Sequence, residues 1–158
     1  MEGTEPGSAP KTMPSRVAIR KHPLHPAIAG FPVAFFTASL ITDLLFWRGA
    51  GQLWADFSFW LILAGCLTGL ASVLTGLIDF LTIERARALP AGWTHFILTD
   101  LAVFLATFNL FLRLQDRYEF VLFAGLGISV VVVVSVLAGA FFGGRLVFRH
   151  LIGPYGPG

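Results

Sequence analysis

The sequence predicts an all-α integral membrane protein, a four-helix up-down bundle, and three observations support this fold class. Hydrophobic residues make up 56% of the 158 residues and charged residues 13%, whereas soluble domains carry about 25% charged residues. The apolar residues form four long blocks, and the connections between the blocks are short. The mean hydropathy of +0.78 is typical of a chain whose surface faces lipid. A formal net charge of only +2, without a basic patch rich in aromatic residues, argues against a nucleic-acid partner.

The chain divides into a tail, a membrane domain and a second, short tail. Residues 1–21 are rich in Gly, Pro, Ser and Thr, so we expect them to form a flexible N-terminal tail. The membrane domain spans residues 22–153, and residues 154–158 follow it as the C-terminal tail. Within the domain, apolar helices are expected at about 27–48, 57–80, 93–113 and 119–143. At ~1.5 Å per residue each can cross a hydrocarbon core of roughly 30 Å, and short loops make consecutive helices antiparallel.

Lys and Arg residues are distributed unequally between the two sides of this bundle. Eight lie on the side that carries both termini and the second loop: Lys11, Arg16, Arg20, Lys21, Arg85, Arg87, Arg145 and Arg149. Three lie on the other side: Arg48, Arg113 and Arg117. Because Lys and Arg accumulate in cytoplasmic loops, the distribution predicts that both termini are cytoplasmic.

All four histidines are expected at the cytoplasmic end of the bundle. His22 and His25 precede the first helix, His95 opens the third, and His150 follows the fourth. Asp79 ends the second helix on the same side. Where a helical face can be assigned, the histidines share it with small or polar residues, so we expect a site inside the mouth of the bundle.

Several kinds of chemistry fit such a cluster. Imidazole is a ligand of haem iron and of zinc, copper and non-haem iron, and a carboxylate can orient the ligand. The candidate ligands are His25, His95 and His150, with His22 as a fourth, and Asp79 as the group that orients one of them. The site would then hold haem b, or another metal ion or a proton. In the remaining interpretation no cofactor is bound, and the histidines cap helix ends and contact lipid headgroups.

An ion pair is expected near the opposite end of the bundle. Asp43 follows His25 by 18 residues, and Arg113 follows His95 by 18 residues, so the two charges lie at similar depth. A charge inside a membrane helix costs a few kcal/mol and usually faces a partner. We expect a pair that locks the bundle; a proton relay, or an Arg113 that reaches outward to the interface, are the alternatives.

Small residues line two of the expected helices at helical spacing and allow close contact between helices. They are Gly65, Gly69, Ser72 and Gly76 on the second helix, and Ser135, Gly139 and Gly143 on the fourth.

Several motifs resemble a bacterial four-helix membrane family called domain of unknown function 2231. They are HPLHPAIAGFP, Asp43, GLIDF, WTHFILTD, the Asn109 and Arg113 pair, and GGRLVFRH, over about residues 22–153. The resemblance implies a bacterial inner-membrane protein, and some relatives are joined to Rieske-type or other redox domains. Three positions differ from the usual pattern: Arg145 stands where an acid is common, Asp100 where an amide is common, and Gly30 where some members have a histidine.

We therefore expect a small membrane subunit that binds haem b or another metal and serves electron transfer. Its expected partners are the lipid bilayer and other membrane or redox subunits. The alternative is a structural or accessory subunit of a larger membrane complex, without a cofactor. No serine, cysteine or carboxylate arrangement has the spacing of a catalytic site, and Cys66 is the only cysteine, so we do not expect an enzyme on its own.

Overall fold

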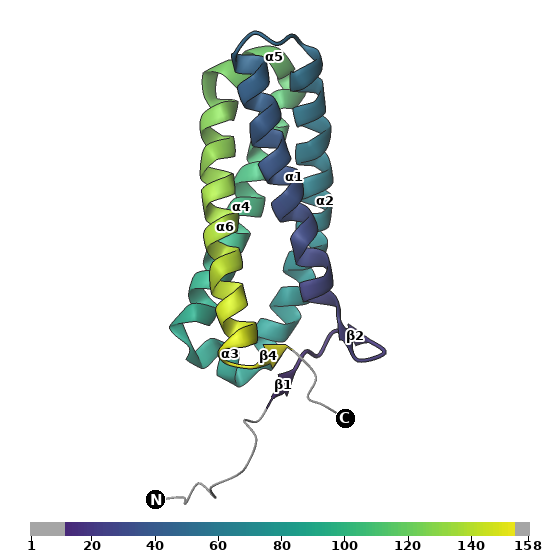
Figure 1. Cartoon of the computed structure of the whole chain (residues 1–158), viewed down its shortest axis with the longest axis vertical. Coiled ribbons are helices and arrows are strands. Elements are labelled where there is room, and N and C mark those ends of the chain that lie inside the picture. Colours follow the sequence, from purple (N-terminus) through teal and green to yellow (C-terminus); the bar gives the residue numbers. More distant parts are fainter. Residues whose placement is uncertain (1–11, 154–158) are drawn as a thin grey trace, which may run out of the picture.

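The computed structural model describes residues 12–153, and most of them are helical. Three long helices come first: α1 (Leu24–Trp47), α2 (Leu53–Thr82) and α4 (Pro90–Gln115). The fourth long helical segment joins α5 (Arg117–Phe120), the π-helical segment η1 (Val121–Gly125) and α6 (Leu126–Phe148). A short helix, α3 (Glu84–Ala88), connects α2 to α4. Figure 1 shows the long helices side by side, with α5 at one end of the molecule and α3 at the other.

Local sequence signals set the helix ends. Proline lacks a backbone N–H and is tolerated in the first turn of a helix, which is where Pro26 lies in α1 and Pro90 in α4. After α1 the chain reverses through Gly49 and Gly51, whose φ values of +82° and +105° favour glycine. Asp116 caps α5 because its side chain accepts hydrogen bonds from the backbone N–H groups of Tyr118 and Glu119, at 3.0 Å each.

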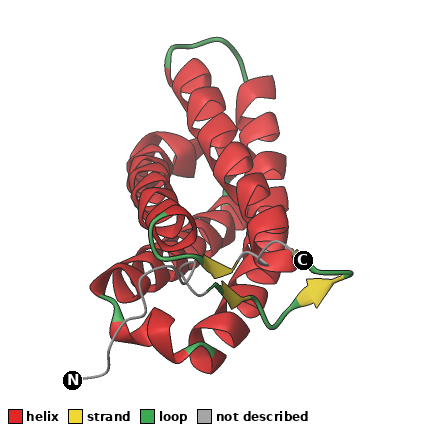
Figure 2. Ribbon diagram, turned by 60° about the horizontal axis from the view of Figure 1, so that its bottom comes forward, coloured by secondary structure: helices red, strands yellow, loops and turns green. Residues whose placement is uncertain are grey.

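The long helices form a ring in which each contacts two others: α1 packs on α2, α2 on α4, α4 on α6, and α6 on α1. Figure 2 shows this arrangement from the end that carries the strands. Phe36, Ile62, Ala102 and Val132 belong to the apolar core that fills the ring. The helices α1 and α4 therefore lie diagonally opposite one another.

The outer surface of the ring is apolar. Large side chains such as Leu67, Phe104, Phe123 and Val134 are exposed there. The four long helical segments are each long and apolar enough to cross a membrane. This apolar outer surface suits contact with lipid.

The chain before α1 forms a strap across one end of the ring. Its strand β1 (Met13–Pro14) pairs in parallel with β4 (Ile152–Gly153), which follows α6. A hairpin follows, in which β2 (Ala18–Ile19) pairs with β3 (His22–Pro23). We call residues 13–23 the N-terminal strap. Part of the segment expected as a flexible tail is thus structured, while residues 1–11 and 154–158 lie outside the described residues.

The helices differ from the predicted ones mainly at their ends. Helix α2 begins at Leu53 and ends at Thr82, beyond both predicted limits, and α6 continues to Phe148. The fourth segment was expected to be one regular helix, but η1 interrupts it.

Candidate functional site

His25 and His95 face each other across the interior of the ring. His25 lies in the first turn of α1 and His95 in the second turn of α4. Their ring centroids are 5.8 Å apart, and the ring planes cross at 76°. Since α1 and α4 are diagonal, the two imidazoles meet in the middle of the bundle rather than along a helix-helix seam.

Each imidazole is held by a backbone carbonyl of a neighbouring helix. Nδ1 of His25 lies 2.9 Å from the carbonyl oxygen of Ser72 in α2, and Nδ1 of His95 lies 2.8 Å from that of Gly139 in α6. A carbonyl only accepts, so each Nδ1 carries the hydrogen and donates it. The neutral ring then keeps its lone pair on Nε2, and within residues 12–153 neither Nε2 makes a hydrogen bond. This is the tautomer that binds metals through Nε2.

Two glycines form the surfaces against which these rings lie. A Cβ added at Gly76 of α2 would be 2.8 Å from the His25 ring, and one added at Gly143 of α6 would be 2.9 Å from the His95 ring. Both distances are too short for a real side chain, so glycine is what brings the rings so close to the two helices. The same small-residue stripes that predict helix packing thus also hold the imidazoles. The sequence signal for this role is the i, i+4 spacing of Gly76 with Ser72 and of Gly143 with Gly139.

The other two histidines do not join this pair. His22 lies in β3 of the N-terminal strap and is exposed. His150 follows α6 and lines a hollow together with Leu89 and Thr94. The structure therefore brings His25 and His95 together, and among residues 12–153 it shows no group of three or more His, Cys, Asp or Glu side chains that could hold a metal.

Asp79 contacts the N-terminal strap instead of a histidine. Its Oδ2 accepts a hydrogen bond of 2.6 Å from the Ser15 hydroxyl. Its Oδ1 accepts hydrogen bonds from the backbone N–H of Arg16, at 2.7 Å, and of Val17, at 3.4 Å. The described hydrogen bonds of Asp79 thus go to the strap, and its role in orienting a ligand stays a prediction.

A small-metal site would need three or four converging ligands. In the part of the chain that the structure describes, no group of three or more His, Cys, Asp or Glu side chains gathers as such a site requires. The described donor set between α1 and α4, near the end of the bundle that carries the N-terminal strap, is a pair of imidazoles. A pair is the number of axial ligands that one haem iron takes.

The expected charge pair lies near the other end of the bundle and is fully buried. Nη1 and Nη2 of Arg113 donate to the two carboxylate oxygens of Asp43 at 2.9 and 2.8 Å. Ser58 and Ser129 accept further hydrogen bonds from the guanidinium, and Asn109 accepts one from Nε. Ser129 also donates to Asp43 at 2.7 Å. Every long helical segment contributes to this network, so the geometry favours a structural lock over a proton relay.

The π-helical segment η1 borders this network. The carbonyl of Gly125 accepts a hydrogen bond of 3.2 Å from Asn109. A Cβ at Gly125 would be 2.8 Å from the carbonyl oxygen of Phe120 and 3.1 Å from Nη2 of Arg113. The wider turn therefore brings the backbone close to the buried guanidinium, a contact that hydropathy does not reveal.

Asp100 is a further acidic residue within the helices. It lies in α4, and its Oδ2 is buried without a hydrogen-bond partner among residues 12–153. Unlike Asp43, it has no cation beside it in this part of the chain.

Comparison with models of protein families gives a match over most of the chain. A family model described as "Predicted membrane protein (DUF2231)" matches residues 21–155. Comparison with curated proteins and with solved structures gives no match. The match covers most of the chain, including the histidine pair and the buried ion pair, and the chain therefore belongs to this family of predicted membrane proteins.

Proposed function

We propose that the chain is a small membrane redox subunit in which His25 and His95 would hold one b-type haem. The observation that carries the proposal is the histidine pair, with its rings 5.8 Å apart and both Nδ1 atoms bound to backbone carbonyls. When bound, the haem would supply one-electron chemistry.

The distance between the rings suits two imidazoles that share one metal. Imidazole–metal bonds are about 2 Å long, so two rings whose centroids are 5.8 Å apart could hold one metal between them. The hydrogen bonds at Nδ1 also fit, because metal-bound histidines commonly donate their other N–H to a carbonyl. These bonds fix the tautomer and the ring orientation before any metal binds.

The number of donors favours haem over a bare metal ion. Zinc-like sites need at least three protein ligands, whereas the porphyrin itself supplies the remaining four ligands of a haem iron. Two imidazoles from opposite helices therefore match the ligands that a haem iron takes from the protein. The porphyrin would have to lie between the α1–α2 and α4–α6 pairs, because the two histidines come from α1 and α4.

We also propose an up-down bundle in the bacterial inner membrane, with both ends of the chain in the cytoplasm. The charge distribution supports this orientation. At the end with the N-terminal strap and α3, residues 12–153 contain seven Lys or Arg residues and two acids. The acids are Asp79 and Glu84. Because basic residues stay on the cytoplasmic side, the histidine pair would lie near that surface and within reach of a soluble or membrane redox partner.

The test is a reduced-minus-oxidised absorption spectrum of the protein, purified after expression with a haem precursor. We expect Soret and α bands that are lost in His25→Ala and in His95→Ala and kept in His22→Ala and in His150→Ala. The last two variants are matched controls, since they remove the same group outside the pair. Metal analysis of the same samples separates haem iron from a bare metal.

Other results would contradict the proposal. Bands that persist in His95→Ala would exclude this ligand pair. Folded protein without a Soret band or bound metal would favour the alternative, a structural or accessory subunit that packs against a larger membrane complex.

A further inference from the structure

The last turns of α6 carry a shallow hollow of about 560 Å³ that is separate from the histidine pair. Its lining residues are Ala140, Phe141, Gly144, Arg145, Phe148 and Arg149. The absence of a side chain at Gly144 keeps the floor open, since the nearest group that a Cβ there would meet is Phe148, at 3.9 Å. The hollow thus joins an apolar surface to two cationic groups.

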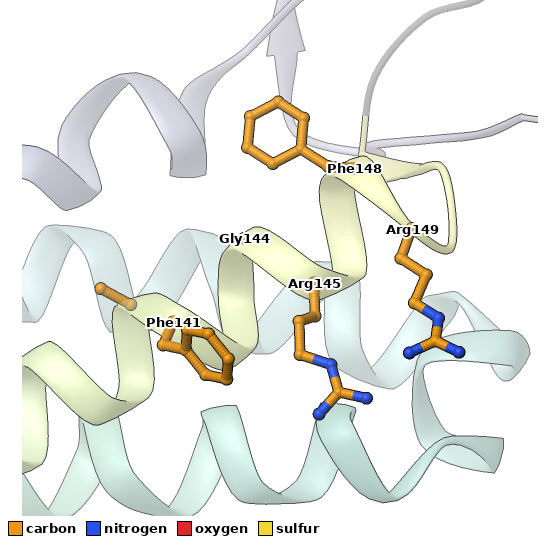
Figure 3. A pocket seen from close by; sticks show the side chains of 6 residues that line it. Phe141, Gly144, Arg145, Phe148 and Arg149 are labelled. Carbon is orange, nitrogen blue, oxygen red and sulfur yellow. The ribbon is translucent and has the colours of Figure 1, made fainter.

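The two arginines leave the same side of α6, while Phe148 points away on the other side (Figure 3). Within residues 12–153 neither guanidinium has an acidic partner or a hydrogen bond. The guanidinium carbon of Arg145 lies over the Phe142 ring, 5.8 Å from the ring centroid. Two free guanidinium groups one helical turn apart can bind one phosphate group through several charge-assisted hydrogen bonds.

The position of the two arginines in the fold indicates which kind of anion they would bind. Phe141 is 65% exposed and Phe148 86% exposed on an apolar helix that can cross a membrane, so both side chains would face lipid. The arginines lie in the last turn of that helix and just after it, where long cationic side chains reach the headgroup layer. A second hollow, of about 280 Å³, shares both arginines and extends toward Pro90 at the start of α4, which leaves room for a headgroup.

We propose that this surface is a binding site for an anionic glycerophospholipid. Arg145 and Arg149 hold the phosphate, and an acyl chain lies along the apolar surface of Phe141 and Gly144. Basic pockets between membrane helices on the cytoplasmic side are typical sites for such headgroups. The proposal does not depend on a haem.

The experiment uses the full chain in nanodiscs of equal parts phosphatidylglycerol and phosphatidylcholine. The protein is extracted in mild detergent, and the lipids that remain bound are measured by native mass spectrometry. We expect retained phosphatidylglycerol, reduced about tenfold in Arg145→Gln/Arg149→Gln. A matched control, Arg20→Gln/Arg85→Gln, removes the same charge from the same end outside the hollow and should retain the lipid.

A second variant tests the apolar part of the site. Gly144→Leu fills the floor of the hollow without changing the charge, and we expect it to weaken lipid retention. Millimolar inorganic phosphate should not displace the lipid; displacement would show a simple anion site and overturn the proposed lipid. Equal retention in the Arg145 and Arg149 variant, or equal loss in the control, would overturn the site, and circular dichroism establishes that each variant is folded.

Discussion

Arg113 is the largest fully buried side chain among those described, and its surroundings explain how a membrane bundle tolerates it. Both Asp43 and Arg113 have side chains with 0% exposure. Desolvation makes such a pair costly unless the remaining donors and acceptors are satisfied. Here two serines and an asparagine complete the hydrogen bonding of the guanidinium.

Removing only the cation should therefore destabilise the bundle strongly. We expect Arg113→Met to lower the free energy of unfolding by about 3–5 kcal/mol, because the Asp43 carboxylate would remain buried without a cationic partner. Denaturant unfolding in a fixed detergent, followed by helical circular dichroism, measures the change.

Two controls distinguish this penalty from loss of packing. The double variant Asp43→Asn/Arg113→Met removes both charges, so it should recover part of the lost stability. Arg117→Met breaks the partly exposed pair with Asp56 and should cost no more than about 1 kcal/mol. If the double variant were as unstable as Arg113→Met, the unpaired carboxylate would not be the cause.

At the scale of helices, the glycines beneath the histidines decide how closely the helices pack. We expect Gly76→Val and Gly143→Val to push the imidazole rings away and to destabilise the protein by about 1–3 kcal/mol. If haem binds as proposed, the same variants should also lower the Soret absorbance per protein. Thermal unfolding and the absorption spectrum, measured on one sample, provide both readouts.

Glycines elsewhere in the helices serve as matched controls. A Cβ at Gly30 of α1 or Gly127 of α6 meets nothing within 4 Å. Gly30→Ala and Gly127→Ala should leave stability unchanged or raise it by up to about 1 kcal/mol, because alanine favours a helix. A loss of stability at these positions equal to that at Gly143 would contradict a specific contact with the ring.

The helices could be predicted from sequence much better than the site. Long apolar blocks identify a membrane helix whatever its neighbours are. Asp43 and Arg113 each follow a histidine by 18 residues, and this equal spacing was enough to place them at the same depth. The same topology placed all four histidines at one end but could not tell which of them face one another. His25 and His95 are held by carbonyls of other helices, and that contact depends on tertiary packing.

Short irregular segments could not be predicted for a different reason. The strands of the N-terminal strap have two residues each, so no alternation of apolar residues can reveal them. The segment is held mainly by Asp79 and by β4, both distant in sequence. Because these contacts are invisible in the local sequence, the composition of residues 1–21 predicted a free tail.

At the scale of the whole molecule, the strap links the first described residues to the end of α2 and to the last strand. Loss of the Asp79 carboxylate removes the acceptor of three hydrogen bonds, which the Ser15 hydroxyl and the backbone N–H groups of Arg16 and Val17 donate. We expect Asp79→Ala to speed tryptic cleavage after Arg16, Arg20 or Lys21 severalfold, while the helical circular dichroism stays unchanged.

Glu84→Ala is the control for this prediction, because it removes an exposed acid at the same end of the bundle. Its cleavage rate should equal that of the unmodified protein. Identical rates in Asp79→Ala and Glu84→Ala would show that Asp79 does not hold the strap.

The pairing of β1 with β4 brings the two ends of the described chain together. The backbone N–H of Met13 donates to the carbonyl of Leu151 at 3.0 Å, and that of Ser15 donates to Gly153 at 3.1 Å. A short linker could therefore join these ends, and new ends could be opened at Gly49–Gly51, where added side-chain atoms meet nothing within 4 Å. Such a circular permutant would keep every helix, the histidine pair and the buried ion pair while moving the ends of the described chain to the opposite end of the bundle.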